Sequence, residues 1–381
     1  MHDALAAHVA REAGLTGLVA LVSRRGETHA DAIGALSEGG PPMTRDTIFR
    51  IASMTKPITA AAAMLLVEDG VIGLDDPVDR FLPELANRKV LRAIDSPLDD
   101  VVPLRRPITL RDLLALTCGF GMILAAPGRY PVQKAYDDAG MAPAARIPRF
   151  PPDEWMARLA ALPSVRQPGE AWMYHSGLDV TGVLIARATG KSFSAFLRER
   201  IFDPLGMKDS GFFVPPEKIT RFMTSYGTAK HGDGVVVFDD PINGVYREPP
   251  PFESGASGLV STVDDLLAFH RMLLGKGAML LSPGSVALMT HVAITPEQRA
   301  TARNFLDKNS SWGLGMTVVR ERNHLSMKAG AFGWEGGYGT SAFADPSEDL
   351  VGVLLTTRLL DPPATPEWFT DFWTLTYEAL S

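Results

Sequence analysis

The chain has 381 residues, of which 46% are hydrophobic and 21% charged, so it can bury a large core and hold more than one structural region. Its net charge of −7, without a basic cluster, argues against nucleic acid and anionic membrane surfaces as partners. Cys118 is the only cysteine, which excludes an intramolecular disulfide and a cysteine-based zinc site. The eight histidines are scattered and no CxxC, HExxH, P-loop or GxGxxG pattern occurs, so we expect no metal and no cofactor.

The N-terminal residues 1–14 are predicted to form an amphipathic helix. They lack the basic start and apolar run of a secretory signal. No apolar stretch approaches the length that spans a bilayer. We therefore expect a cytoplasmic protein without a membrane partner, whose oligomeric state the sequence leaves open.

The next elements are a hairpin and two helices. Residues 18–34 predict two strands that turn at Gly26. After the β-type run 47–51, an apolar, alanine-rich helix begins near Ser53 and closes at residues 69–70. Thr109 and Asp112 have the spacing of a capping box, which predicts a short helix that ends near Gly119.

The middle of the chain is mostly helical in pattern. Residues 127–153 are rich in proline, glycine and alanine and predict a long irregular excursion, of the kind that forms functional lids or is disordered. Helices are expected over 178–189, which stops at Gly190, and over 192–201. Thr262 is expected to cap a further helix that runs to about residue 275.

The end of the chain predicts strands over 313–319, 339–344 and 350–356, followed by a helix over 367–380. Strands at both ends with helices between them indicate an α+β fold, in which a sheet is completed by N- and C-terminal segments around an inserted helical region. The expected domains are a sheet domain of residues 1–61, 183–238 and 311–381, and a helical domain of residues 62–182 and 239–310, with the active site between them.

Ser53 precedes Lys56 by three residues, a spacing that occurs nowhere else in the chain. Positions three apart lie on one face of a helix, so the amine reaches the hydroxyl as an activated nucleophile requires. Pro57 fits best if Ser53 lies in the first turn, where backbone N–H groups have no intrahelical partner. The alternative interpretation is an exposed helix start with an ordinary lysine, because a chain of this size contains about one such motif by chance.

Two other segments offer partners for Ser53. Tyr174 can accept a proton if a nearby cation lowers its pKa, or it can be a core aromatic with a satisfied hydroxyl. Its neighbour His175 points to a different face, so we expect it behind the reacting groups or on the surface. The glycine-rich run 330–340 predicts either a hairpin or a close approach of backbone or ligand, where an N–H could join that of Ser53 in an oxyanion hole. Cys118 is expected to be a small buried hydrophobe.

Taken in order, these motifs resemble the serine β-lactamase and penicillin-binding-protein superfamily, on the class C β-lactamase and family VIII carboxylesterase branch. The resemblance covers nearly the whole chain and implies a β-lactamase-like fold, with an antiparallel sheet flanked by N- and C-terminal helices. The matching segments are Ser53-Met54-Thr55-Lys56, Tyr174-His175-Ser176 in the place of Tyr-x-Asn, Pro204-Leu205-Gly206-Met207, Gly258-Leu259-Val260-Ser261-Thr262, Trp312-Gly313-Leu314-Gly315 and the glycine-rich strand.

The resemblance implies that Ser53 is the nucleophile and that Lys56 and Tyr174 share its activation. Whether a phenolate or the amine is the base stays open. The backbone amides of Ser53 and Trp334 are the expected oxyanion donors. No GxSxG elbow exists in the chain, which disfavours an α/β-hydrolase route to the same chemistry.

One departure from the family pattern narrows the substrate. Where β-lactamases and D,D-peptidases carry Lys/His-Thr/Ser-Gly, this chain has Ala331-Phe332-Gly333 and then Trp334. The missing cation normally holds a carboxylate, and Glu335 has the wrong charge to replace it. Family VIII esterases are similar to this chain in showing Trp-x-Gly-Gly here. The residues expected to contact substrate are Trp334, Phe332, Gly333 and Ser176.

The sequence therefore predicts a serine esterase that forms an acyl-enzyme on Ser53 with a neutral, fairly apolar small-molecule ester. One alternative keeps the acylation but makes the protein a β-lactamase, a D-amino-acid peptidase or an acyltransferase. Another is a relative that only binds a ligand in the same cleft. The proline-rich segments and residues 299–306 are expected to wall that cleft.

Overall fold

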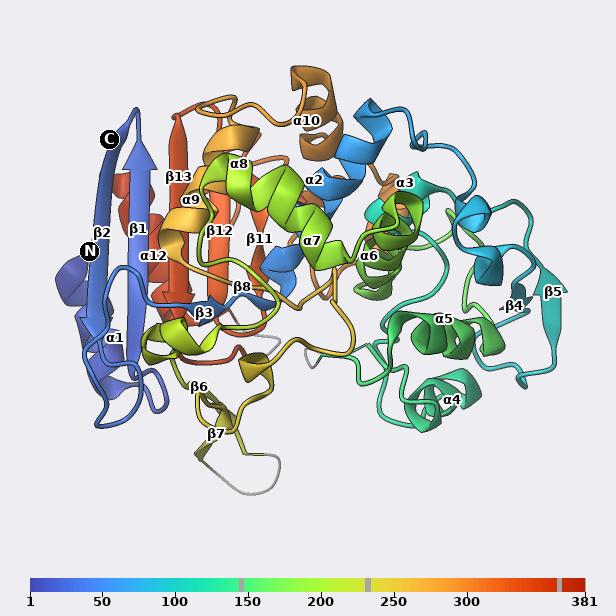
Figure 1. Cartoon of the computed structure of the whole chain (residues 1–381), viewed down its shortest axis with the longest axis horizontal. Coiled ribbons are helices and arrows are strands. Elements are labelled where there is room, and N and C mark those ends of the chain that lie inside the picture. Colours follow the sequence, from blue (N-terminus) through green and yellow to red (C-terminus); the bar gives the residue numbers. More distant parts are fainter. Residues whose placement is uncertain (144–146, 230–233, 362–364, 381) are drawn as a thin grey trace.

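A seven-stranded antiparallel sheet forms one side of the molecule, and a mainly helical region forms the other (Figure 1). The structure is a computed structural model that describes residues 1–143, 147–229, 234–361 and 365–380. The strands follow the order β2-β1-β13-β12-β11-β10-β9, so the N-terminal hairpin pairs with the last strand of the chain. Their bounds are β1 (Gly17–Arg24), β2 (Glu27–Gly34), β9 (Ser310–Trp312), β10 (Thr317–Val319), β11 (Phe332–Gly336), β12 (Thr340–Asp345) and β13 (Leu350–Thr356).

Helices cover both faces of the sheet, because its central strands are apolar on both sides. Successive residues of a strand point to opposite faces. Leu18 of β1 therefore joins the core under α1 (His2–Arg11) and α12 (Glu367–Glu378), whereas Val19 faces the core that contains α9 (Val263–Leu273). Figure 1 shows α9 and α12 on opposite sides of the strands.

The helical region is built around α2 (Thr55–Glu68), which is buried over twelve consecutive residues from Thr55 to Leu66. Such a helix is enclosed by other elements on all sides, and α6 (Ser176–Thr189) packs against both it and α3 (Leu110–Leu114). The remaining helices are α4 (Pro131–Asp138), α5 (Pro152–Ala161), α7 (Phe193–Leu197), α8 (Asp203–Leu205), α10 (Pro283–Thr290) and α11 (Pro296–Ala300). Three two-stranded sheets pair β3 (Phe49–Arg50) with β8 (Val260–Ser261), β4 (Lys89–Leu91) with β5 (Val101–Pro103), and β6 (Ser225–Thr228) with β7 (Val235–Asp239).

The α+β class and the β-lactamase-like arrangement of sheet and helices are confirmed, whereas three predicted elements need correction. The excursion over 127–153 contains α4 and the start of α5, although its residues 144–146 lie outside the described ones. The helix expected over 192–201 ends at Leu197 and continues as a π-helical turn. The strand expected over 313–319 begins only at Thr317, since Gly315 has a φ of 80° and belongs to a turn.

The predicted domain boundaries stay predictions, and two helices cross them. Helix α9 was assigned to the helical region but packs on β13, β1 and β12. Helix α6 was divided between the two regions at residue 183, yet along its length it contacts α2, α3 and α7. Each of these helices packs against its neighbours along its whole length. A domain boundary drawn from the sequence alone does not predict such contacts.

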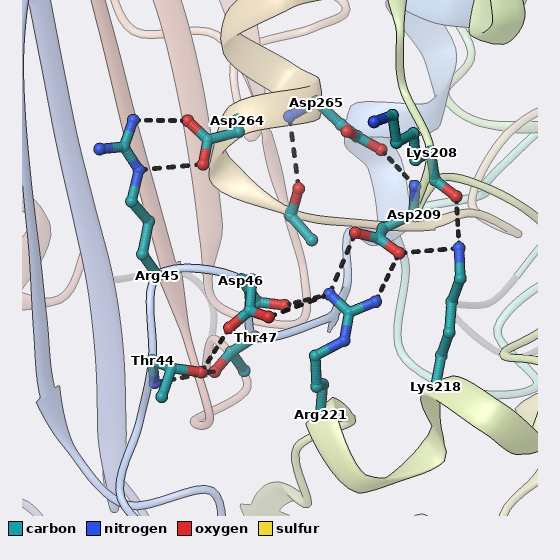
Figure 2. A network of polar contacts seen from close by, with 11 residues as sticks. Thr44, Arg45, Asp46, Thr47, Lys208, Asp209, Lys218, Arg221, Asp264 and Asp265 are labelled. Carbon is teal, nitrogen blue, oxygen red and sulfur yellow. Dashed lines mark hydrogen bonds and ion pairs between the residues drawn. The ribbon is translucent and has the colours of Figure 1, made fainter.

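A network of ion pairs ties the segment before Ser53 to α9 (Figure 2). Arg45 donates to both carboxylate oxygens of Asp264, at 2.7 and 2.9 Å. Arg221 makes the same kind of bidentate contact with Asp209 and also donates to the backbone carbonyl of Asp46 at 2.8 Å.

Among the described residues, no helix combines the length and the apolar character needed to cross a bilayer.

Candidate active site

Ser53 lies in a short 3-10 turn, Ala52–Met54, that leads directly into α2. Ser53 is buried, with 8% of its surface exposed. Pro57 is the third residue of α2, where the missing N–H costs no intrahelical hydrogen bond. The serine hydroxyl therefore stands at the helix start, near its free N–H groups, where negative charge is favoured.

Lys56 points its side chain back along the helix start to Ser53. Its Nζ donates to Ser53 Oγ at 3.0 Å and to the carbonyl of Ala256 at 2.8 Å. Burial lowers the pKa of Lys56 to about 7, although the charge of Asp179 acts in the opposite direction. A substantial share of these amines is therefore neutral near pH 7, so that the amine can accept a proton.

Tyr174 reaches the same point from the segment that precedes α6. The Lys56 Nζ lies 4.3 Å from the centroid of its ring, and the Trp334 indole N–H donates to its hydroxyl at 2.7 Å. Burial raises the pKa of Tyr174, while hydrogen bonds with Ser53 and Trp334 lower it in part. The phenol is thus neutral at physiological pH before substrate binds. The structure brings Ser53, Lys56 and Tyr174 together.

Aromatic side chains hold Tyr174 in place. Phe305 packs on its ring at 4.3 Å between centroids, and Trp172 stacks on it at 5.4 Å. Trp312 contacts Trp334 edge-on at 4.8 Å and anchors its own indole N–H on the carbonyl of Leu114. Phe305 lies within residues 299–306, where the sequence predicted part of the cleft wall.

Trp334 contributes its side chain, and its backbone N–H is directed elsewhere. The N–H of Val319 in β10 donates to the carbonyl of Ala331, so this carbonyl faces β10, while the Ala331 N–H donates to the carbonyl of Lys328. From this carbonyl onward, the backbone groups of successive residues face alternate sides of the strand, so those of Trp334 face β12, where Trp334 pairs with Ala342. This register corrects the expectation that the Trp334 amide is an oxyanion donor.

The same alternation identifies which amides do face the edge beside Ser53. Gly333 and Glu335 point away from β12, and Gly333 is paired with Thr317 of β10. Glu335 lies beyond the end of that pairing, as does Gly337 in the following turn. The strand β11 and the turn that holds Ser53 are in contact, with the backbone of Gly336 beside the carbonyl of Ile51.

The other predicted substrate contacts have different surroundings. Phe332 is buried and lines a hollow with Thr290 and Val318, whose walls do not include Ser53, Lys56 or Tyr174. A Cβ on Gly333 would lie 2.1 Å from the carbonyl oxygen of Ala342, so the neighbouring strand requires this glycine. Both positions serve the sheet, and their contact with substrate stays a prediction. Ser176 is buried as the first residue of α6.

Three further residues complete the picture. His175 is buried, which agrees with a place behind the reacting groups and rules out the surface. Cys118 is buried as expected, and burial raises the pKa of its thiol to about 12. Sequence reasoning missed Asp179, although it is the only charged residue in the buried stretch from Ser176 to Ile185 of α6. It also missed Ala256, which acts through its carbonyl and leaves no mark in the sequence.

Within the described residues, one group of metal-ligand types comes close together, formed by His8, Glu12 and Glu367 at the outer face of the sheet. Its atoms have other partners, because His8 binds Asp371 at 2.7 Å and Arg11 binds Glu367 at 2.6 Å. These ion pairs account for the cluster without an ion.

Known proteins resemble this chain along most of its length. The family described as Beta-lactamase matches residues 2–371. Protein Rv1367c of Mycobacterium tuberculosis is 38% identical over 363 residues, which cover 91% of this chain and 87% of that protein. Esterase EstB of Burkholderia gladioli is 32% identical over 388 residues, covering 96% of this chain and 91% of the esterase.

Among solved structures, the one titled "EstCE1, a hydrolase with promiscuous acyltransferase activity" superposes with a TM-score of 0.82 at 24% identity, and covers 98% of this chain and 97% of its own. That likeness concerns the fold. With the family match over nearly the full sequence and the arrangement of Ser53, Lys56 and Tyr174, the chain belongs to the beta-lactamase family.

Proposed function

We propose that this protein is a serine hydrolase that cleaves carboxylic esters through an acyl-enzyme on Ser53. The observation that carries the proposal is the buried hydrogen bond of 3.0 Å between Lys56 Nζ and Ser53 Oγ, made by an amine whose pKa burial lowers to about 7. A nucleophile with such a base beside it is the requirement for covalent catalysis by a serine. The likeness to an esterase at 32% identity supports the same chemistry.

The proposed reaction has two halves. Ser53 Oγ attacks the ester carbonyl while its proton passes to Lys56 and Tyr174, and the same groups deliver that proton to the leaving alcohol. They then take a proton from water, which attacks the acyl-enzyme, and return that proton to Ser53 Oγ as the bond to the acyl group breaks and the acid leaves. Lys56 and Tyr174 act as one titrating unit in both halves.

The oxyanion needs two backbone donors aimed at the position of its oxygen. The N–H of Ser53 is one of them. We assign the second to the edge of β11 beyond its pairing with β10, at Glu335 or Gly337, because the Trp334 amide faces β12.

A neutral acyl group is the proposed substrate. The Trp334 indole donates to Tyr174 at 2.7 Å, and an indole brings no positive charge for a substrate carboxylate. Glu335 adds to this in its ionised form, whose charge contributes to the raised pKa of Tyr174, although burial raises the pKa of Glu335 itself to about 7. A negatively charged substrate would meet repulsion rather than a partner here.

Replacement of Ser53 by alanine tests the proposal. Hydrolysis of p-nitrophenyl butyrate by S53A should fall by roughly 10⁶-fold, the loss seen for comparable nucleophiles. Ser285 provides the matched control, because it is equally buried in the first turn of a helix, α10, and S285A should keep wild-type activity. Hydrolysis by S53A at a near wild-type rate would overturn the proposal.

Three further measurements separate the alternatives. Higher kcat/KM on a chromogenic cephalosporin than on the ester would make the protein a β-lactamase. Faster transfer of the acyl group to an added alcohol than to water would make it an acyltransferase. A fluorophosphonate that leaves Ser53 unlabelled, as read by mass spectrometry, would indicate a protein that only binds its ligand.

A further inference from the structure

Asp179 is a buried carboxylate close behind the reacting groups. It lies in the first turn of α6 with 2% of its surface exposed. Its Oδ1 accepts a hydrogen bond from Ser254 Oγ at 2.6 Å and another from the backbone N–H of Ala256 at 3.1 Å. Buried carboxylates are costly unless they are paired and hydrogen-bonded, so this arrangement calls for a reason.

Ala256 connects Asp179 to Lys56. The N–H of this residue donates to Asp179, and its carbonyl accepts the 2.8 Å hydrogen bond from Lys56 Nζ. Two of the three donor directions of the Lys56 ammonium are thereby defined, one toward Ala256 and one toward Ser53. If the carboxylate were lost, the Ala256 carbonyl would no longer be held in position for Lys56.

The second carboxylate oxygen faces the backbone turn that presents Tyr174. Asp179 Oδ2 lies 3.5 Å from Nε2 of His175. His175 has a φ of 89°, which is strained for a residue with a side chain, and its ring meets the ring of Tyr174 edge-on. Asp179 thus touches neighbours of both groups that surround Ser53.

We propose that Asp179 is a positioning residue, whose carboxylate holds Ala256 against Lys56 and whose negative charge stabilises the protonated form of Lys56. This inference rests on the proposed ester hydrolysis, because it concerns how the base of that reaction is set. Asp179 does not touch the substrate; it acts through the Ala256 peptide and through space.

The charges around Lys56 give the sign of the expected effect. Burial lowers the pKa of Lys56 to about 7 and Asp179 raises it, while burial raises the pKa of Asp179 to about 6 and Lys56 lowers it. His175 is neutral, since burial and then Lys56 hold its pKa well below the usual value. The other titratable groups that the described residues bring to the site are Tyr174, a neutral phenol, and Glu335, whose own pKa burial raises to about 7 and which acts on Tyr174.

Removal of the Asp179 charge must therefore lower the pKa of Lys56 further. The limb of the pH profile that reports Lys56 then moves to lower pH, whichever form of the amine is active. If neutral Lys56 is the base, the acidic limb moves. If protonated Lys56 stabilises a Tyr174 phenolate, the basic limb moves in the same direction. A residue with only a structural role would not shift either limb.

The test compares D179N with D179E and D265N. Asp265 matches Asp179 closely, because it is also buried, accepts from Ser210 Oγ at 2.8 Å and from a backbone N–H at 2.9 Å, and has its pKa raised to about 6 by burial. It lies in α9 within the polar network of Figure 2, and the charged groups that act on it are Asp209 and Lys218. D265N therefore reproduces the loss of a buried hydrogen-bonded carboxylate whose nearby amine is Lys218 rather than Lys56.

Two readouts are measured against pH, namely kcat/KM for p-nitrophenyl butyrate and the rate at which a fluorophosphonate labels Ser53. In D179N the Lys56 limb should move to lower pH by about one unit, with kcat reduced by about 100-fold because the amine is misplaced. D179E should keep the limb in its wild-type position, since the charge remains. D265N should lose stability while its limb stays unchanged.

A limb that stays at its wild-type pH in D179N, with losses no larger than those of D265N, would overturn the inference. If D179N does not fold, S254A decides, because it removes the 2.6 Å hydrogen bond that stabilises the anion, together with the bonds of Ser254 Oγ to Ser257, but keeps the carboxylate. It should shift the limb in the same direction by less. If the wild-type protein labels at Ser53 but turns over no ester, the proposed function fails. The labelling rate against pH then still decides the role of Asp179.

Discussion

Trp334 divides its backbone and its side chain between two roles. Its N–H belongs to the pairing of β11 with β12, while its indole donates to the Tyr174 hydroxyl at 2.7 Å. An indole N–H is a donor only, so it fixes Tyr174 as an acceptor and directs the phenolic proton toward Ser53 and Lys56. At this position the indole binds the phenol without offering positive charge to a substrate.

W334F should therefore impair catalysis through Tyr174. The loss of one hydrogen bond to a buried hydroxyl is worth about 1.4 kcal/mol, which corresponds to about a tenfold decrease in kcat/KM. The measurement is steady-state hydrolysis of p-nitrophenyl butyrate.

Trp368 provides the matched control for this prediction. It is buried in α12, and its indole N–H has no hydrogen-bond partner among the residues that the structure describes. W368F should retain wild-type kcat/KM. If W334F hydrolysed the ester as fast as W368F, the hydrogen bond would have no role in catalysis.

At the scale of elements, the start of α2 is positioned by a turn that is distant in sequence. Gly315 donates its N–H to the carbonyl of Leu114, and its α-carbon lies against the first turns of α2. A Cβ here would lie 2.5 Å from the Cβ of Ala60 and 3.0 Å from the carbonyl oxygen of Lys56. The glycine lets the sheet approach the helix that carries both Ser53 and Lys56.

G315A should be more damaging than the same substitution at Gly275. Both glycines have positive φ values, 80° and 70°, but Gly275 is exposed and has nothing within 4 Å of an added Cβ. G275A should lower the free energy of unfolding by about 1 kcal/mol and leave kcat unchanged, because only the backbone is strained. G315A adds overpacking and should cost about 3 kcal/mol and reduce kcat.

Denaturant unfolding and ester hydrolysis check this pair together. Equal free energies of unfolding for the two variants, with equal kcat, would show that contact with α2 is not what requires glycine at position 315.

Elements whose signals are local were predictable from the sequence. Thr262 caps α9 by accepting from the N–H of Asp265, and Thr109 forms a capping box with Asp112. Gly190 ends α6 with a φ of 68°. In each case the residues that decide the structure lie within four positions of one another, so a pattern records them.

Contacts that join distant segments were not predictable. The hydrogen bond from Lys56 to Ala256 spans 200 positions, and it depends on how α2 packs against the 254–258 segment. The Trp334 amide was misassigned because strand register fixes the direction of each N–H, and register is set by the partner strands. The residue types of the site were therefore readable, while the roles of their backbone groups needed the fold.

At the scale of the whole molecule, the two ends of the chain complete one sheet. Leu18 of β1 lies opposite Thr356 of β13, and α12 covers the face that α1 also covers. Trp373 of α12 is buried against Gly352 and donates to Ser341 Oγ at 3.1 Å. Trp334, in contrast, belongs to the core on the other face.

W373A should therefore destabilise the protein and spare its chemistry. Removal of such a large buried side chain should lower the free energy of unfolding by about 3–5 kcal/mol, measured by guanidinium denaturation. The folded fraction should keep wild-type kcat/KM. L288A, at an exposed position of α10, should change neither quantity. A loss of kcat/KM in folded W373A would mean that the sheet transmits packing changes to the site.

The pairing of β1 with β13 also governs when the protein acquires activity during its synthesis. A ribosome makes β1 early and β13 far later, so one edge of this apolar strand, whose other edge pairs with β2, stays open while most of this sequence is translated. Gly315 and β11, which contact the segment that carries Ser53, are also made late in translation. Catalytic competence should therefore arise only after β11 and β13 have been made, and until then the open edge of β1 is free to pair with other chains.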